Sequence, residues 1–327
     1  MRRASLLGIL LGLSLLTALV LWQGAGLLAQ TFSQLGWRIA WLPLVYLMPL
    51  GAALLSWRYL FPSGRAPRWG LLLYGVWLNY SINWLLPVGQ VGGELARIRL
   101  LLSRKFASAP AIASIVGDQT LQLVTQALYA LLGIALLAYS QLGEGYSGRL
   151  WAVIGVSLVV LVVVSGGFYW VQHQGLFRLL SRVARKFPRL FSRADQPIEE
   201  QAQAVDLALQ ALYRRRDRLL VASLWRVVFR LTTAAETWLV LDFLGITVSV
   251  AVALVLESLG QAIRSAAFLI TGGLGVEEGG LMVVGAALGL PPALGLSLSL
   301  CKRVRELLIG VPGLLALQME AGWRMLK

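Results

Sequence analysis

The sequence predicts an all-α fold: a polytopic helical bundle in a membrane, with residues 1–327 forming a single transmembrane domain. Hydrophobic residues make up 58% of the chain and charged residues 13%, whereas soluble proteins average about 45–50% and about 25%. The apolar residues gather in runs of about 20, the length of a membrane-spanning helix. Between the runs lie most of the 29 Lys and Arg, against 15 Asp and Glu, as in cytoplasmic loops. This composition argues against a soluble, disordered or nucleic-acid-binding protein.

Runs of apolar residues place the expected spanning helices. Those long enough to cross the bilayer are residues 5–22, 39–60, 109–139, 150–171, 219–244, 248–268 and 306–322. The first run exceeds the apolar stretch of about 7 to 15 residues in a signal peptide, so a retained helix is predicted. Two further runs, 69–88 and 281–300, are also apolar, but each borders a glycine-rich stretch that carries acids.

These glycine-rich stretches predict two re-entrant helical hairpins. Basic residues near 58–68 and 97–105 both favour the cytoplasm, so the run between them must enter and leave by one face. The same reasoning applies between Arg264 and Lys302, around residues 271–280 (TGGLGVEEGG). Unpaired backbone groups facing lipid would each cost several kcal/mol, so both loops should line a protein-walled or watery cavity. The loop glycines are Gly92, Gly93, Gly272, Gly273, Gly275 and Gly279.

A weak internal similarity links the two stretches. Residues 87–94 (PVGQVGGE) align with residues 271–278 (TGGLGVEE), which places Glu94 over Glu278 and Asp118 over Lys302, 184 positions later. The alignment suggests an internal repeat with halves of about 1–171 and 219–327. Transporters often carry broken helices in corresponding halves, with the substrate site between them. Charge counting favours the same orientation for both halves, whereas an inverted pair suits alternating access, and both stay open.

Residues 172–218 predict a cytoplasmic loop of two amphipathic helices. The segment holds ten Lys and Arg and five Asp and Glu. Apolar residues recur at helical spacing from Leu176 to Phe187 and from Ile198 to Leu212, and prolines separate the two helices. We interpret the segment as anchored on anionic headgroups rather than as a partner-binding arm.

The available residue types limit the chemistry. Cys301 is the single cysteine and His173 the single histidine, so neither an intrachain disulfide, a His-based triad nor a Cys/His zinc cluster is available. The glycine-rich segments lack the strand, helix start and Lys-Ser/Thr of a phosphate loop. We therefore expect no catalytic residue, no metal site and no cofactor.

Ionisable residues inside the apolar runs mark the candidate binding site, because each costs about 2.5–3.5 kcal/mol at a helix centre. Asp118 needs a cation, and the expected partner is Arg97, followed by Lys302 or Arg303. Glu257 and Arg264 lie two turns apart and should both point at the second glycine-rich loop. The candidate substrate-binding residues are Glu94, Arg97, Asp118, Glu257, Arg264, Glu277, Glu278, Arg303 and Arg305.

A structural role competes with binding at all of these positions, because salt bridges could simply hold the broken helices together. Arg226, Arg230 and Glu236 are spaced along one helix face, and for them internal pairing is favoured over substrate binding. Glu306 is interpreted as structural.

Several separated motifs resemble one known family. They are residues 83–97 (NWLLPVGQVGGELAR), 118–120 (DQT) and 273–280 (GLGVEEGG), which are similar to the lysylphosphatidylglycerol-synthase transmembrane-region family, also called flippase-like. With residues 257–264 and 302–307, the chain is most similar to the branch associated with hopanoid biosynthesis. The resemblance covers nearly the whole chain. It implies a multi-pass protein of the bacterial inner membrane that moves a lipid between leaflets or presents it for export.

The sequence therefore favours a lipid translocase or carrier for a hopanoid or an anionic phospholipid, whose headgroup is held by buried Arg, Glu and Asp between re-entrant elements. Because the chain ends at Lys327 without an aminoacyl-transferase domain, enzyme activity is not expected. The expected partners are anionic headgroups at the basic loop and a lipid-export or biosynthesis protein. The alternative is a non-transporting scaffold or regulatory subunit of hopanoid biosynthesis or modification, acting through residues 172–218. A membrane enzyme using Glu277 and Glu278 is less favoured, because neighbouring side chains diverge.

Overall fold

The computed structural model describes residues 33, 35–86, 91–140, 198–266 and 276–325, and every regular element in these residues is a helix. This confirms the predicted all-α fold. The chain first forms the 3-10 helix η1 (Gly36–Ala40), α3 (Trp41–Val45) and α4 (Leu47–Tyr59). The following elements are α5 (Trp69–Leu85), α6 (Gly92–Ser103), α7 (Ser108–Ser140), α11 (Ile198–Tyr213), α12 (Arg216–Phe243), α13 (Val250–Ala266), α14 (Val276–Ala287) and α15 (Pro292–Met325).

Two stretches of the described residues are long and apolar enough to cross a membrane, Gly36–Tyr59 and Ser108–Tyr139. They match the spans predicted at 39–60 and 109–139. Helices also form at two other predicted spans, as α12 and α13. The predicted spans at 5–22 and 150–171 lie outside the described residues.

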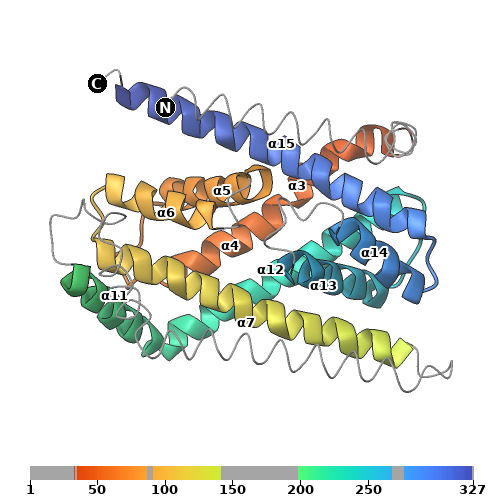
Figure 1. The fold of residues 1–327 in the computed structure, drawn as a ribbon, viewed down its shortest axis with the longest axis horizontal. Coiled ribbons are helices and arrows are strands. Elements are labelled where there is room, and N and C mark those ends of the chain that lie inside the picture. The colour runs from red at the N-terminus through yellow and green to blue at the C-terminus, as the bar shows by residue number, and fades with distance from the viewer. Residues whose placement is uncertain (1–32, 34, 87–90, 141–197, 267–275, 326–327) are drawn as a thin grey trace.

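Helices pack against each other on both sides of each glycine-rich stretch: α5 with α6, and α13 with α14 (Figure 1). Whether these pairs are re-entrant stays a prediction, and α13 was expected to be a spanning helix rather than part of the second hairpin. Glycine permits their close packing. A Cβ on Gly93 would lie 2.4 Å from the backbone oxygen of Asn79, and one on Gly280 would lie 2.7 Å from Ile263 Cδ1. The face by which each hairpin enters the membrane stays a prediction, and the loop glycines at 272–275 lie outside the described residues.

The predicted boundaries at 281–300 and 306–322 are wrong. The chain breaks at Leu288–Pro291, where Gly289 adopts a φ of 74°, and α15 then continues without interruption for 34 residues. The predicted cytoplasmic cluster Lys302–Arg305 therefore lies inside a helix, with Lys302, Arg303 and Arg305 only 5–6% exposed. Similarly, Glu277 and Glu278 lie in the first turn of α14 rather than in a loop. A charge count along the sequence cannot distinguish a basic loop from basic residues that are paired inside a helix.

The helices before and after α11 share one pattern of lengths. α6 and α14 both have 12 residues, from Gly92 and from Val276, and α7 and α15 begin at Ser108 and Pro292. Both pairs of starting residues are 184 positions apart, the separation seen in the sequence alignment. α5 and α13 both have 17 residues. The turns before α7 and α15 each contain a left-handed residue, Lys105 (φ 61°) and Gly289 (φ 74°).

Helices of the first half pack on helices of the second half. α4 lies antiparallel to α12 (Figure 1). Arg218 Nε, near the start of α12, donates to the backbone oxygen of Tyr59 at the end of α4 (3.1 Å). At the other end, Leu42 shares a hydrophobic core with Val240. α5 packs on α15, and α13 packs on α7.

The second amphipathic helix predicted in the loop forms as α11, whereas the first lies outside the described residues. Val205 and Leu209 are buried against Ala113 of α7, and Leu212 joins the main core. The apolar face of α11 therefore packs on the protein, which leaves Arg214 exposed.

Candidate functional site

A first cluster of buried charges joins α6, α7 and α12; we define it as Glu94, Arg97, Asp118 and Arg226. Arg97 Nη1 lies 2.8 Å from Asp118 Oδ2, and Arg226 donates to the other Asp118 oxygen. Asp118 is fully buried. Arg97 Nη2 also lies 3.9 Å from Glu94. Glu94 occupies the first turn of α6, where the helix dipole favours a negative charge.

Amide side chains complete the surroundings of Glu94 and close the first hairpin. Asn83, near the end of α5, donates to both Glu94 oxygens at 3.3 and 3.2 Å and accepts from the backbone N–H of Gly93 at 2.9 Å. Gln119 of α7 also donates to Glu94. These contacts fix the acidic start of α6 between α5 and α7.

The predicted partner of Asp118 is confirmed for Arg97 and wrong for Lys302 and Arg303. Sequence reasoning missed Arg226 as the second partner. Arg226 carried a signal, since it is a charged residue within an apolar run, but its partner lies 108 positions away. Spacing along one helix cannot reveal such a pair.

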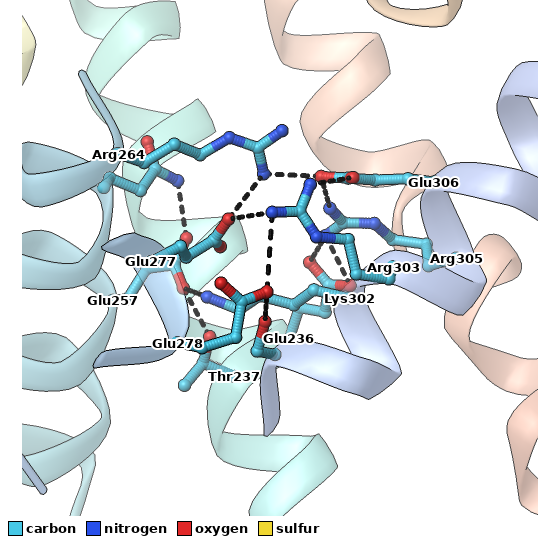
Figure 2. Close-up of polar contacts among 12 residues, drawn as sticks. Glu236, Thr237, Glu257, Arg264, Glu277, Glu278, Lys302, Arg303, Arg305 and Glu306 are labelled. Atoms are coloured by element: carbon cyan, nitrogen blue, oxygen red, sulfur yellow. Dashed lines mark hydrogen bonds and ion pairs between the residues drawn. The ribbon is translucent and has the colours of Figure 1, made fainter. Parts of the chain in front are cut away.

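A second cluster joins α12, α13, α14 and α15 (Figure 2). Arg303 lies at its centre, 3.0 Å from Glu277, 3.1 Å from Glu306 and 3.7 Å from Glu278. Arg264 lies 3.3 Å from Glu277 and 2.6 Å from Glu306. The full second cluster is Glu236, Glu257, Arg264, Glu277, Glu278, Lys302, Arg303, Arg305 and Glu306.

Two further ion pairs attach α12 and α13 to α15 (Figure 2). Arg305 Nη1 donates to both oxygens of Glu236, at 2.8 and 2.6 Å, and its guanidinium group lies over the ring of Tyr46, 4.0 Å from the centroid. Lys302 Nζ lies 2.5 Å from Glu257. Lys302 and Arg305 lie three residues apart on α15, so one face of this helix carries both cations toward Glu257 and Glu236.

All nine predicted binding residues lie in one of the two clusters. Arg264 contacts Glu277 and Glu306, whereas Glu257 pairs with Lys302, although the two residues were expected to share an orientation. Glu236 and Glu306 belong to the second cluster as well, although they were set aside as internal pairs. Substrate binding by these residues stays a prediction.

Gln261 of α13 links the second cluster to Arg230 of α12. Its Nε2 donates to Glu257 Oε1 at 2.5 Å, and its Oε1 accepts from Arg230 Nη1 at 2.5 Å. Arg230 Nη2 donates to the backbone oxygen of Gln122 at 3.1 Å. A polar chain therefore runs from the second cluster across to α7 and α12.

The pairing of these side chains explains how both clusters can stay charged while buried. Buried charges are tolerated only when they are paired and hydrogen-bonded, and the carboxylates of both clusters have cationic or polar partners. The first turn of α6 supplies Glu94 to the first cluster, and the first turn of α14 supplies Glu277 and Glu278 to the second. No group of three or more His, Cys, Asp or Glu side chains in the described part of the chain is arranged to hold a metal ion.

Comparison with protein-family models decides the family. Residues 6–313 match the family described as "Lysylphosphatidylglycerol synthase TM region". The chain belongs to this family. Membership confirms the resemblance seen in the motifs and, with the all-helical structure, shows a helical membrane protein; it does not extend to the hopanoid branch. No curated protein and no solved structure matches the chain.

Proposed function

We propose that the protein is a translocase that moves a lipid between the leaflets of a bacterial inner membrane without covalent chemistry. The family supports a membrane protein of lipid modification or translocation. The observation that carries the choice of translocation is the arrangement of the two hairpins, because each brings the acidic start of a short helix to a buried charged cluster. Gln261 connects the second cluster to Arg230, which lies one helical turn from Arg226 of the first cluster. Broken helices facing a shared polar centre are typical of transporters.

The proposal includes an internal duplication of inverted topology. Helix lengths agree to within one residue between α5–α7 and α13–α15. The starts of α6 and α7 lie 184 positions before those of α14 and α15, and the left-handed residue Lys105 lies 184 positions before Gly289. Since α4 and α12 are antiparallel, a twofold axis relating them would run perpendicular to the helices. Spanning helices run roughly along the membrane normal, so this axis would lie in the membrane plane.

The charges of the connections support the inverted arrangement. At one end of the bundle, the links 60–68 and 104–107 contain Arg65, Arg68, Arg104 and Lys105. At the corresponding end of the second half, residues 244–249 and 288–291 contain no charged residue. Basic links favour the cytoplasm. Charge counting favoured parallel halves only while the buried Lys302–Arg305 segment was assigned to a loop.

The inverted topology predicts opposite accessibility for two matched turns. We expect Ala107→Cys to react with a membrane-impermeant maleimide only from the cytoplasmic side, and Pro291→Cys only from the opposite side. Both residues are exposed, 184 positions apart. The buried Cys301 would first be replaced by Ala, and that variant alone should stay unlabelled. Labelling of both turns from the same side contradicts the inverted repeat.

Translocation is tested with purified protein in liposomes. We expect dithionite to quench inner-leaflet fluorescent phospholipid or hopanoid probes faster in protein-containing vesicles than in empty ones. The exposed-residue variant Arg99→Gln serves as a control and should retain the rate. Since no nucleotide-binding motif is present in the sequence, movement should need no ATP. Vesicles with folded protein that match empty vesicles for every lipid probe would remove translocation as the function.

A further inference from the structure

Arg226 and Arg230 stand out among the buried charges because their positive charge is incompletely balanced. They lie one turn apart on α12 and are 2% and 4% exposed, and like charges at this spacing repel each other. Arg226 shares its single carboxylate, Asp118, with Arg97. Around them, three guanidinium groups (Arg97, Arg226 and Arg230) face two carboxylates, Glu94 and Asp118.

Arg230 has no carboxylate within ion-pair distance among the described residues. Its terminal nitrogens donate to Gln261 Oε1 and to the Gln122 backbone oxygen, which are both neutral acceptors. The second cluster shows the opposite imbalance, with five carboxylates against four cations. The excess positive charge therefore lies around Arg226 and Arg230, and the excess negative charge lies in the second cluster.

Several N–H groups here also lack an acceptor. They are Nε and Nη1 of Arg226, Nε of Arg230, and Nε and Nη2 of Arg97, all buried. A buried unsatisfied donor costs about 1–3 kcal/mol, and more when it is charged. Arg303 and Arg305 also have a buried Nε in this state, but carboxylates balance their charges.

We propose that Arg226 and Arg230 form an anion subsite that binds the phosphate oxygens of a lipid headgroup in place of the Gln261 amide oxygen. The inference rests on the proposed translocase and names the chemistry that it recognises. Guanidinium groups match the geometry of phosphate through paired N–H donors. The ring of Phe229 lies beneath both arginines, 5.8 and 5.3 Å from their guanidinium carbons, and holds them on one side of α12.

Gln261 gives the subsite a link to the second hairpin. Its amide oxygen occupies the place of an anionic oxygen at Arg230, while its amide nitrogen holds Glu257. A phosphate that displaces Gln261 breaks the contact between α13 and Arg230 of α12, while Thr237 of α12 still donates to Glu257 of α13. Anion binding therefore loosens the hairpin that carries the second cluster.

The experiment measures lipid binding to the purified full chain by native mass spectrometry. Wild type should bind phosphatidylglycerol at least about tenfold more tightly than a phosphate-free glycosyl diacylglycerol, since charge-assisted hydrogen bonds have this strength. Arg230→Gln should lose this preference, whereas Arg216→Gln, an exposed arginine at the start of α12, should keep it.

Gln261→Glu keeps the test decisive if Arg230→Gln fails to fold. The new carboxylate should pair with Arg230, but it also replaces the amide donor to Glu257 by a like charge. We therefore expect folded protein that melts below wild type and that has lost the preference for phosphatidylglycerol. Inorganic phosphate alone distinguishes the source: stabilisation by phosphate indicates a free oxyanion, and stabilisation by phosphatidylglycerol only indicates a lipid headgroup.

Equal binding of both lipids to wild type, or an unchanged preference in Gln261→Glu, overturns the subsite and assigns the free donors to internal water. The proposed function fails separately. If the wild-type protein moves a phosphate-free lipid in liposomes but shows no preference for an anionic lipid in binding, the translocase is retained and the subsite is excluded. Selective binding without movement of any probe retains the subsite and excludes the translocase.

Discussion

Asp118→Asn should cause the largest loss of stability of any single carboxylate replacement in the first cluster. Asp118 is fully buried and accepts hydrogen bonds from Arg97 and Arg226. Its neutralisation leaves two buried guanidinium groups without their shared counter-charge, and breaking a buried pair in this way costs about 3–5 kcal/mol. We expect a lower melting temperature of the detergent-purified protein and a lower yield of folded material.

A second replacement separates charge imbalance from loss of packing. Arg226→Gln in the Asp118→Asn background removes one of the stranded cations, so the double variant should be more stable than Asp118→Asn alone. Asp242→Asn, at an exposed position on α12, is the matched control and should melt like wild type. A double variant that melts lower than Asp118→Asn contradicts the pairing.

Glu278→Gln should have the largest effect on transport relative to its effect on folding. Glu278 accepts from Ser299 at 3.0 Å and lies 3.7 Å from Arg303. Glutamine has nearly the same shape and can still accept from Ser299, so the fold should be retained. If a charged half-helix start is needed for the headgroup, lipid movement in liposomes should fall by about tenfold or more.

Glu94→Gln, the corresponding change in the first hairpin, should show the same separation of transport from folding. Glu320→Gln provides the control, because this carboxylate lies at the partly exposed end of α15 and pairs with Arg104 on the surface. Normal transport by both hairpin variants would remove these acids from the site. Loss of folded protein instead would make them structural.

Charge pairs were predicted correctly where the partners lie close in sequence. Glu94 and Arg97 are one helical turn apart, and Asp118 lies in the next helix, so helical periodicity and the cost of an isolated buried charge were enough to pair Arg97 with Asp118. Pairs between distant helices were not found. Arg305 and Glu236 are 69 positions apart, and only packing of α12 against α15 brings them together.

The hairpins show the same difference between features that are local in the sequence and contacts between distant helices. Glycine clusters beside acids indicated where α6 and α14 begin, because glycine and charge content are local properties of the sequence. The boundary between α14 and α15 was misplaced because Lys302, Arg303 and Arg305 look like the basic edge of a span. Their carboxylate partners come from α12, α13 and α14, so nothing near them in the sequence distinguishes them from loop residues.

The amino-acid sequence by itself determined that this is a helical membrane protein of the lysylphosphatidylglycerol-synthase transmembrane family with two glycine-broken hairpins, because hydropathy, glycine content and motif order are local properties. The tertiary structure alone decided which charges meet, that α4 and α12 are antiparallel, and that Arg230 is left beside neutral acceptors. Burial and pairing depend on which helices become neighbours. A charge that is costly in an isolated helix becomes stable, or stays available for a ligand, according to the side chains that other helices place beside it.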